Sequence, residues 1–413
     1  MLPLLPLAGL LCLAAAQPAW NTIAPLPFAR SDHTATALGS AIYIAGGCDG
    51  AQKCANGMCS CTSTTRNMLA YSPATNAYTA RAPLLQPRYR HIVCPLADES
   101  GMVLLGGRTL TPANATTNDA IITAVDVYRP ASNSWATLGV AYPADLGSDN
   151  SCTTALSGVI YVMGGYDTFY SVATTVMYAF TLGGSGGGAF AKVAAMPMAL
   201  GDFSSTLAPT GNIHVLGGFT TTDPTDWWCR PTTSHFVYNP TLNTWDNSTI
   251  PPMPVGLGQK DDAIVLSGRL FTIGGETKSK TSGCTDLDIV ALTKVFSYDP
   301  LAKTWRNETF LPSPIIRTAG AALGGIAYLF GGQGPIIDSG DTIPILFTAY
   351  SYTFAPPPAP APAPLVYSPG AFGGAIAGTL VVACLLAACA ARLCGAFQRP
   401  SASAKDTVLH SAA

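Results

Sequence analysis

The 413-residue sequence is poor in charged residues, which make up only 11% of it. Its 21 Lys and Arg stand against 23 Asp and Glu, so it has no basic excess with which to bind nucleic acid. It also lacks the His-Glu-x-x-His and phosphate-loop patterns that mark two large enzyme classes. We therefore expect neither a nucleic-acid partner nor an enzyme of those classes.

Long apolar runs lie at both ends of the chain. Residues 2–16 lack Lys and Arg but end in three alanines, which indicates a signal peptide cleaved before Gln17. Residues 371–391 hold 21 consecutive uncharged residues, which as an α-helix would cover about 31 Å, the thickness of a bilayer core. Arg392 and Arg399 follow, so the positive-inside rule puts the tail in the cytoplasm.

These features predict a single-pass type I membrane protein with its ectodomain extracellular or lumenal. The expected parts are a signal peptide (1–16), an ectodomain (17–354), a Pro/Ala-rich stalk (355–370), a transmembrane helix (371–391) and a short cytoplasmic tail (392–413). Gly370, Gly374 and Gly378 have the small-residue spacing that lets two membrane helices touch, which makes a homodimer one expectation.

The ectodomain repeats an apolar run that ends in two glycines. The intervals between successive pairs are 60, 58, 53, 57 and 57 residues, a period typical of propeller blades. Strands buried on both faces read as continuous apolar runs, and paired glycines allow close backbone approach or a positive φ. The six pairs are Gly46-Gly47, Gly106-Gly107, Gly164-Gly165, Gly217-Gly218, Gly274-Gly275 and Gly331-Gly332.

Each period also carries a third strand ending in Tyr and a fourth strand with an aromatic residue. Trp135, Trp245 and Trp305 each follow such a Tyr by seven residues, and Arg-x-x-His occurs at Arg30/His33 and Arg88/His91. This pattern resembles the kelch repeat over residues 19–354. The resemblance implies an all-β kelch-type β-propeller whose loops bind a partner.

The number of blades follows from counting glycine pairs and aromatic fourth strands. After Gly331-Gly332 the chain enters prolines without a fourth aromatic strand, whereas residues 18–23 supply Trp20 at the start. We expect this N-terminal strand to complete the last blade and close a six-bladed ring.

The eight ectodomain cysteines are expected to form disulfides in an oxidising compartment. Cys94 and Cys152 occupy equivalent inner strands of adjacent blades, and Cys229 and Cys284 occupy equivalent loops, so these are the two predicted pairs. Cys48, Cys54, Cys59 and Cys61 crowd one loop at spacings that suit disulfides better than zinc. The sequons at Asn114, Asn247 and Asn307 predict N-glycosylation.

Candidate ligand-binding residues gather in the loops that follow strands two and four, which share one face of a propeller. Trp227 and Trp228 could stack on a sugar or anchor a protein, or pack against a disulfide. The two Arg-x-x-His motifs could clamp an anion, or could be structural parts of the repeat. The candidates are Arg30, Asp32, His33, Arg88, Tyr89, Arg90, His91, Trp227, Trp228, Arg230, Lys260, Asp261, Asp262 and Arg317.

The sequence therefore favours a module that binds a protein or glycan ligand, with no cofactor and no metal. The alternative is a carbohydrate-acting enzyme, because a sialic acid epimerase and galactose-oxidase-like copper enzymes are also built on kelch blades. A copper site needs converging imidazoles, and of the four ectodomain histidines, His214 and His235 lie inside predicted strands. This favours an epimerase-like activity over a copper-radical oxidase.

Overall fold

A computed structural model of the chain describes residues 19–354, except 51, 56–57, 111–119, 168–171, 185–186, 222–228, 259–262, 286–287 and 336–341. The predicted signal peptide, stalk, transmembrane segment and tail lie outside these residues, as do the glycines at 370, 374 and 378. Among the described residues, no helix is long and apolar enough to cross a membrane.

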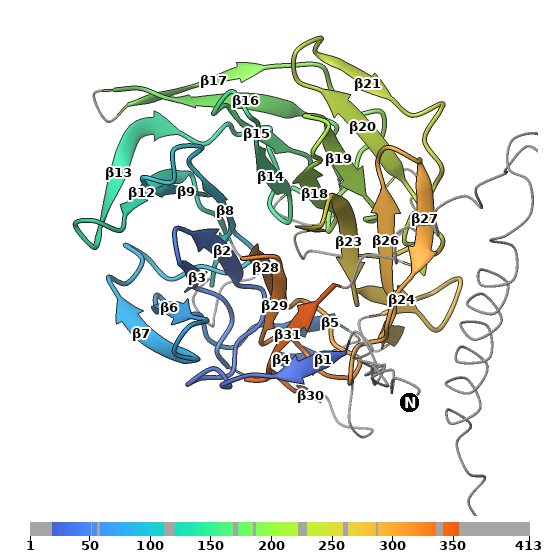
Figure 1. The fold of residues 1–413 in the computed structure, drawn as a ribbon, viewed down its shortest axis with the longest axis horizontal. Coiled ribbons are helices and arrows are strands. Elements are labelled where there is room, and N and C mark those ends of the chain that lie inside the picture. The colour runs from blue at the N-terminus through green and yellow to red at the C-terminus, as the bar shows by residue number, and fades with distance from the viewer. Residues whose placement is uncertain are drawn as a thin grey trace, which may run out of the picture. The chain divides into compact units, whose positions relative to one another are not determined.

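The described residues form six four-stranded antiparallel sheets arranged in a ring (Figure 1). We number them as blades 1–6 along the chain. Blade 1 consists of β2 (Thr34–Leu38), β3 (Ala41–Ala45), β6 (Met68–Ser72) and β7 (Ala77–Arg81). Blade 2 consists of β8 (Ile92–Pro95), β9 (Met102–Leu105), β12 (Ala124–Arg129) and β13 (Ser134–Ala141). Blade 3 consists of β14 (Ser151–Thr154), β15 (Ile160–Met163), β16 (Met177–Leu182) and β17 (Gly188–Lys192). Blade 4 consists of β18 (Ser204–Leu207), β19 (Ile213–Leu216), β20 (His235–Asn239) and β21 (Thr244–Asp246). Blade 5 consists of β22 (Ile264–Leu266), β23 (Arg269–Ile273), β26 (Val295–Asp299) and β27 (Thr304–Asn307). Blade 6 consists of β28 (Ala319–Leu323), β29 (Ile326–Phe330), β31 (Ala349–Thr353) and β1 (Trp20–Thr22).

The sixth blade closes the ring with both ends of the described chain. β1 is its outermost strand and pairs with β31, with Trp20 opposite Tyr352 and Thr22 opposite Tyr350. The prediction of six blades completed by the N-terminal strand is therefore confirmed.

The apolar cores lie between blades rather than within them. Met68 of blade 1 packs with Val93 and Leu104 of blade 2, and each of four further junctions also buries one such mixed cluster. A blade is therefore covered on both faces by its neighbours, which is why its strands read as unbroken apolar runs. The junction of blades 4 and 5 differs, because its core is divided into two smaller clusters.

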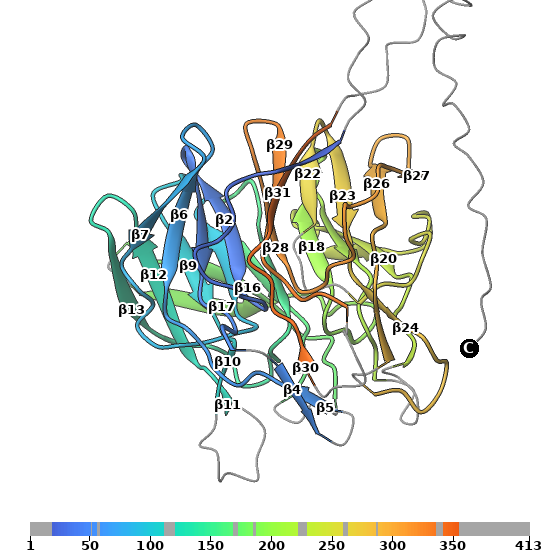
Figure 2. The same cartoon turned by 90° about the horizontal axis from the view of Figure 1, so that it is seen from below.

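The two faces of the ring are unequal. On one face, which we call the turn face, turns of two to six residues join first to second and third to fourth strands. On the other, the loop face, three accessory sheets project from the loops between second and third strands (Figure 2). They are β10 (Arg108–Thr109) with β11 (Ala120–Ile121), β24 (Glu276–Lys278) with β25 (Ile289–Ala291), and β30 (Thr342–Ile343) with β4 (Gln52–Ala55) and β5 (Met58–Ser60).

Among the residues whose side chains the structure describes, three disulfides fasten the propeller. Cys94–Cys152 joins β8 to β14, the innermost strands of neighbouring blades, and Cys229–Cys284 joins loops of blades 4 and 5. Both pairings match the prediction. Within the crowded loop, Cys48 bonds to Cys61, and Cys54 lies opposite Cys59 in the β4–β5 register.

Candidate functional site

Each blade is entered by a segment that pairs with the residue directly after its glycine pair. The glycines permit this pairing, because Gly47 has a φ of +102° and a Cβ there would lie 2.6 Å from the Ser31 carbonyl oxygen. The six pairs are Ser31–Cys48, Tyr89–Arg108, Ser148–Tyr166, Gly201–Phe219, Gly258–Glu276 and Ile316–Gln333. The repeat thus brings one pair of residues per blade to the inner end of the loop face.

The residue after each of these entry positions adopts left-handed backbone in five blades. These residues are Asp32, Arg90, Asp149, Asp202 and Arg317, with φ between 50° and 57°. We call them the axial ring; the equivalent residue of blade 5, at position 259, lies outside the described residues. Such a conformation costs a non-glycine residue about 1–3 kcal/mol and persists only where its surroundings enforce it.

Backbone hydrogen bonds between blades enforce it here. The Arg90 amide donates to the Asp32 carbonyl at 2.9 Å, and the Asp32 amide donates to the Arg317 carbonyl at 3.2 Å. The Asp202 amide donates to the Asp149 carbonyl at 2.9 Å. The ring residues are thereby held in fixed positions around the centre of the loop face.

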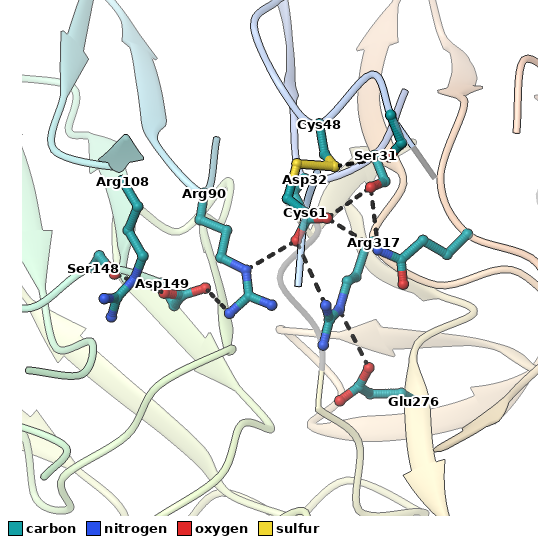
Figure 3. Close-up of polar contacts among 12 residues, drawn as sticks. Ser31, Asp32, Cys48, Cys61, Arg90, Arg108, Ser148, Asp149, Glu276 and Arg317 are labelled. Carbon is teal, nitrogen blue, oxygen red and sulfur yellow. Dashed lines mark hydrogen bonds and ion pairs between the residues drawn. A yellow bond between two sulfur atoms is a disulfide. The ribbon is translucent and has the colours of Figure 1, made fainter. Parts of the chain in front are cut away.

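The side chains of the axial ring and its neighbours form a series of alternating charges (Figure 3). Arg90 bridges Asp32 and Asp149 at 3.1 and 3.0 Å. Asp149 also accepts from Arg108 at 3.3 Å. On the other side, Arg317 lies 3.9 Å from Asp32 and 3.6 Å from Glu276. The series runs Arg108, Asp149, Arg90, Asp32, Arg317, Glu276, and each charge faces its opposite.

Burial makes this series electrostatically strong. Asp149 and Arg108 are fully buried, and Arg90 is 8% exposed. Burial acts to lower the pKa of Arg317 and so does Arg90, but Glu276, Asp32 and Asp202 outweigh them and raise it. The cation is therefore retained at all ordinary pH values.

Asp202 is the ring member with an unusual titration. Burial, followed by the repulsion of Asp149, raises the pKa of Asp202 from 3.8 to about 7. Its Oδ2 atom has no hydrogen-bond partner among the described residues. Nearby Tyr166 is fully buried, and its pKa is raised first by burial and then by Asp202. A carboxyl group that titrates near neutrality is therefore held at the centre of the loop face.

The arginines of the two Arg-x-x-His motifs lie beneath the ring and hold the glycine turns. Arg30 donates to the Gly46 carbonyl at 3.4 Å, and Arg88 donates to the Gly106 carbonyl at 3.2 Å and to Asp126 at 2.7 Å. Both are almost fully buried, and burial lowers the pKa of each to about 10.

The histidines of the motifs pack against the preceding blade. His91 fills the space beside Gly46, where an added Cβ would lie 2.7 Å from its ring, and His33 lies beside Gly331 in the same way. These contacts favour the structural interpretation of both motifs over an exposed anion clamp.

The structure therefore separates the predicted site residues into groups. Asp32, Arg90 and Arg317 meet in the axial ring, and Tyr89 is buried beside it. Arg230 is exposed on a loop of blade 4. Trp227, Trp228, Lys260, Asp261 and Asp262 lie outside the described residues. In the described part of the chain, no three His, Cys, Asp or Glu side chains are placed to share a metal ion.

Four charged residues of the site were not predicted. Arg108 and Glu276 directly follow a glycine pair, and Asp149 and Asp202 occupy the position of Asp32 in their own repeats. Superposing the six repeats on their glycine pairs would have found them. The Arg-x-x-His motif could not have revealed Asp149 and Asp202, because blades 3 and 4 lack both its Arg and its His.

The fold and this site define the class of the protein as a six-bladed β-propeller with a polar, buried centre on its loop face. A family model described as the kelch motif matches residues 29–84, the part of the chain that forms blade 1. This motif match and the six-bladed fold agree with the resemblance to kelch-repeat β-propellers that the sequence predicts.

A solved structure of the protein YjhT supports the same fold. It is 13% identical in sequence, with a TM-score of 0.59, and the match covers 80% of this chain and 97% of that one. At this identity the likeness shows the fold alone. The search of curated proteins found no matching relative.

Proposed function

We propose that this kelch propeller is a membrane-anchored recognition module that binds a protein or glycan ligand on its loop face, outside the cytoplasm. The observation that carries the proposal is the inequality of the two faces. The three accessory sheets of the described chain project from the loop face, whereas the described residues of the turn face form only short turns between strands. Binding functions concentrate on elaborated loops held by a rigid scaffold.

The accessory sheets are preorganised, which lowers the entropy cost of binding. β30 of blade 6 pairs with β4 of blade 1, so loops at the two ends of the propeller share one sheet. Cys48–Cys61 closes the base of the β4–β5 hairpin, and Cys229–Cys284 ties the loops of blades 4 and 5 together. The disulfides also support an oxidising compartment for the propeller.

A glycan array and a proximity-labelling experiment on intact cells test this proposal with the full-length protein. The test variant replaces residues 52–60 with a short Gly/Ser turn, which removes Cys54 and Cys59 together and leaves no odd thiol. The control is Leu156→Ser on the turn face, where Leu156 is 78% exposed. Ligand capture should fall at least tenfold in the hairpin variant and stay unchanged in the control; equal capture by both would contradict the proposal.

The second candidate is a carbohydrate-acting enzyme of the epimerase type, and the axial ring favours it. Asp202 is a buried carboxyl group whose pKa lies near neutrality, as suits proton transfer, and Arg90 and Arg317 could hold an anionic sugar. Asp202→Asn would then abolish turnover of an anionic sugar while leaving capture through the β4–β5 hairpin intact. Turnover unaffected by this change excludes Asp202 as the acid or base.

A further inference from the structure

Two turns on the turn face expose a leucine side chain. They are residues 240–243 of blade 4 and 300–303 of blade 5, which join the third strand of each blade to the fourth, and we call them the leucine tips. Leu242 is 68% exposed and Leu301 is 85% exposed. Turns usually carry small or polar residues, because an apolar side chain in water contributes nothing to folding.

The fold does not require leucine in these turns. The corresponding turns of blades 1 and 2 have the same proline at their first position, but Ala-Thr and Ala-Ser follow it, at residues 74–75 and 131–132. All four turns connect the same pair of antiparallel strands in their blades. The leucines are therefore dispensable for closing the hairpin and available to a partner.

The backbone of both leucine tips is already hydrogen-bonded, so it can leave water at low cost. In blade 4 the Oδ1 atom of Asn239 accepts two amides of the tip, each at 3.0 Å. In blade 5 the Oδ1 atom of Asp299 accepts two amides at 3.0 and 2.9 Å. Arg269 lies 2.8 Å from the Asp299 carboxylate and offsets its charge. Unpaired backbone groups oppose entry into apolar surroundings, and these amides are paired.

The leucine tips carry little charge. Lys303 is the one charged residue in the two turns, whereas the first turn of blade 2 holds Asp98 and Glu99. Membrane surfaces with anionic headgroups attract lysine and repel carboxylates. The sign of the charge therefore suits a surface that is rich in phosphate.

The described chain leaves the propeller on the same face, one blade away. β31 runs toward the turn face and ends in blade 6, on the side opposite the accessory sheets (Figure 2). The ring of Phe354, the last described residue, lies 5.1 Å from that of Phe271 in blade 5, so the chain leaves at the junction of blades 5 and 6. Residues 355–370 link this point to the apolar run at 371–391, which we predict to span a membrane.

The residue types of the leucine tips favour a lipid surface over a protein partner. Binding hot spots on proteins are rich in Trp, Tyr and Arg and poor in Leu. Neither tip contains an aromatic residue or an arginine. Leucine, by contrast, is among the residues that enter the boundary between lipid headgroups and acyl chains.

We infer that the leucine tips contact the surface of the lipid bilayer in which the chain is anchored, with Leu242 and Leu301 inserted among the headgroups. This inference rests on the membrane anchor of the proposed function. Two leucines alone bind a bilayer weakly, but the anchor keeps the membrane at a high effective concentration near the turn face. The loop face then points away from the bilayer, so its ligand arrives from the surrounding fluid rather than from the same membrane.

Lipid cross-linking of the full-length protein tests the contact. The protein is reconstituted in nanodiscs of palmitoyl-oleoyl phosphatidylcholine that contain a lipid with a diazirine just below its headgroup, and cross-linked peptides are mapped by mass spectrometry. Peptides that include 240–243 and 300–303 should be labelled. The double variant Leu242→Ser/Leu301→Ser should lower this labelling about tenfold or more.

The matched control is Leu156→Ser. Leu156 is also on the turn face and is 78% exposed, but it belongs to blade 3, across the ring from blade 6. This variant should leave the labelling of both leucine tips unchanged, and an equal loss in the control would overturn the inference. Both variants should keep the wild-type melting temperature, because exposed side chains contribute little to folding.

Extraction of membranes with alkaline carbonate separates failure of this inference from failure of the proposed anchor. If the protein stays in the membrane but the leucine tips are not labelled, or are labelled equally in the double variant, the inference is overturned and the anchor stands. Release of the wild-type protein by carbonate overturns both.

Discussion

Trp20 stacks on Tyr352 with the ring centroids 4.9 Å apart, and this contact joins the start of the described chain to its last strand. The same two residues lie opposite each other in the β1–β31 register. Closure of the propeller therefore depends on one short strand whose main apolar contribution is a single indole ring.

Removal of this strand should prevent the ring from closing. Deletion of residues 17–24 should abolish recovery of folded protein, because it exposes the edge of β31 and the core beneath it. Trp20→Ala alone should lower the free energy of unfolding by about 2 kcal/mol. The yield of folded protein measures the effect of the deletion, and denaturant unfolding of the purified variant measures that of Trp20→Ala. Wild-type yield and stability after the deletion would disprove closure by β1.

Loss of the Arg88 side chain should be among the most damaging single changes. Arg88→Ala leaves Asp126, which is 2% exposed, as an unpaired buried charge, so it should cost about 3–5 kcal/mol. Arg129→Ala, which removes only an exposed bond to Ser100, should cost less than about 0.5 kcal/mol. Similar losses in the two variants would show that Arg88 is not a structural residue.

Asp202 should make the fold less stable as the pH rises. Its pKa is about 7 in the fold against 3.8 when unfolded, so folding binds a proton. The stabilisation from the neutral form is complete below pH 4 and is lost as the pH rises through about 7. Asp202→Asn should therefore remove this decline and raise the melting temperature at pH 8 but not at pH 4. Parallel pH profiles for the two proteins would refute the assignment.

The disulfide between inner strands should stabilise the whole propeller. Cys94 and Cys152 are 58 residues apart, so replacing both with Ala frees a long loop and should cost about 4 kcal/mol. Replacing Cys48 and Cys61, 13 residues apart, should chiefly increase hydrogen exchange in the loop-face hairpin. Mapping of non-reduced peptides by mass spectrometry checks both pairings directly.

The fold could be predicted almost completely because each blade needs the same types of residue at equivalent positions of the sequence. Gly46 and Gly47 must accommodate positive φ and close contact, and Trp135, Trp245 and Trp305 must cover an edge between blades, so these residue types recur. The closing strand could be found because six glycine pairs require six aromatic fourth strands, and Trp20 supplies the one that is otherwise missing.

The centre of the site could be predicted only in part, for a physical reason. The axial position demands a backbone conformation and a bond to the next blade, which any residue that tolerates the strain can supply. Asp149 and Asp202 meet that demand without an accompanying Arg or His. The pairing of β30 with β4 joins residues 342–343 to residues 52–53, and strands this short carry no periodic pattern.

The position of β31 within its sheet has a mechanical consequence. This strand is the last described segment of the chain, yet it lies between β1 and β29 rather than at an edge. Tension applied to the chain beyond residue 354 would load β31 in shear, against three residue pairs on one side and five on the other. Hydrogen bonds loaded in parallel must break together, whereas those at a free edge can be peeled one at a time. The order of strands in the final blade therefore makes its exit point the part of the propeller best suited to bear a pull.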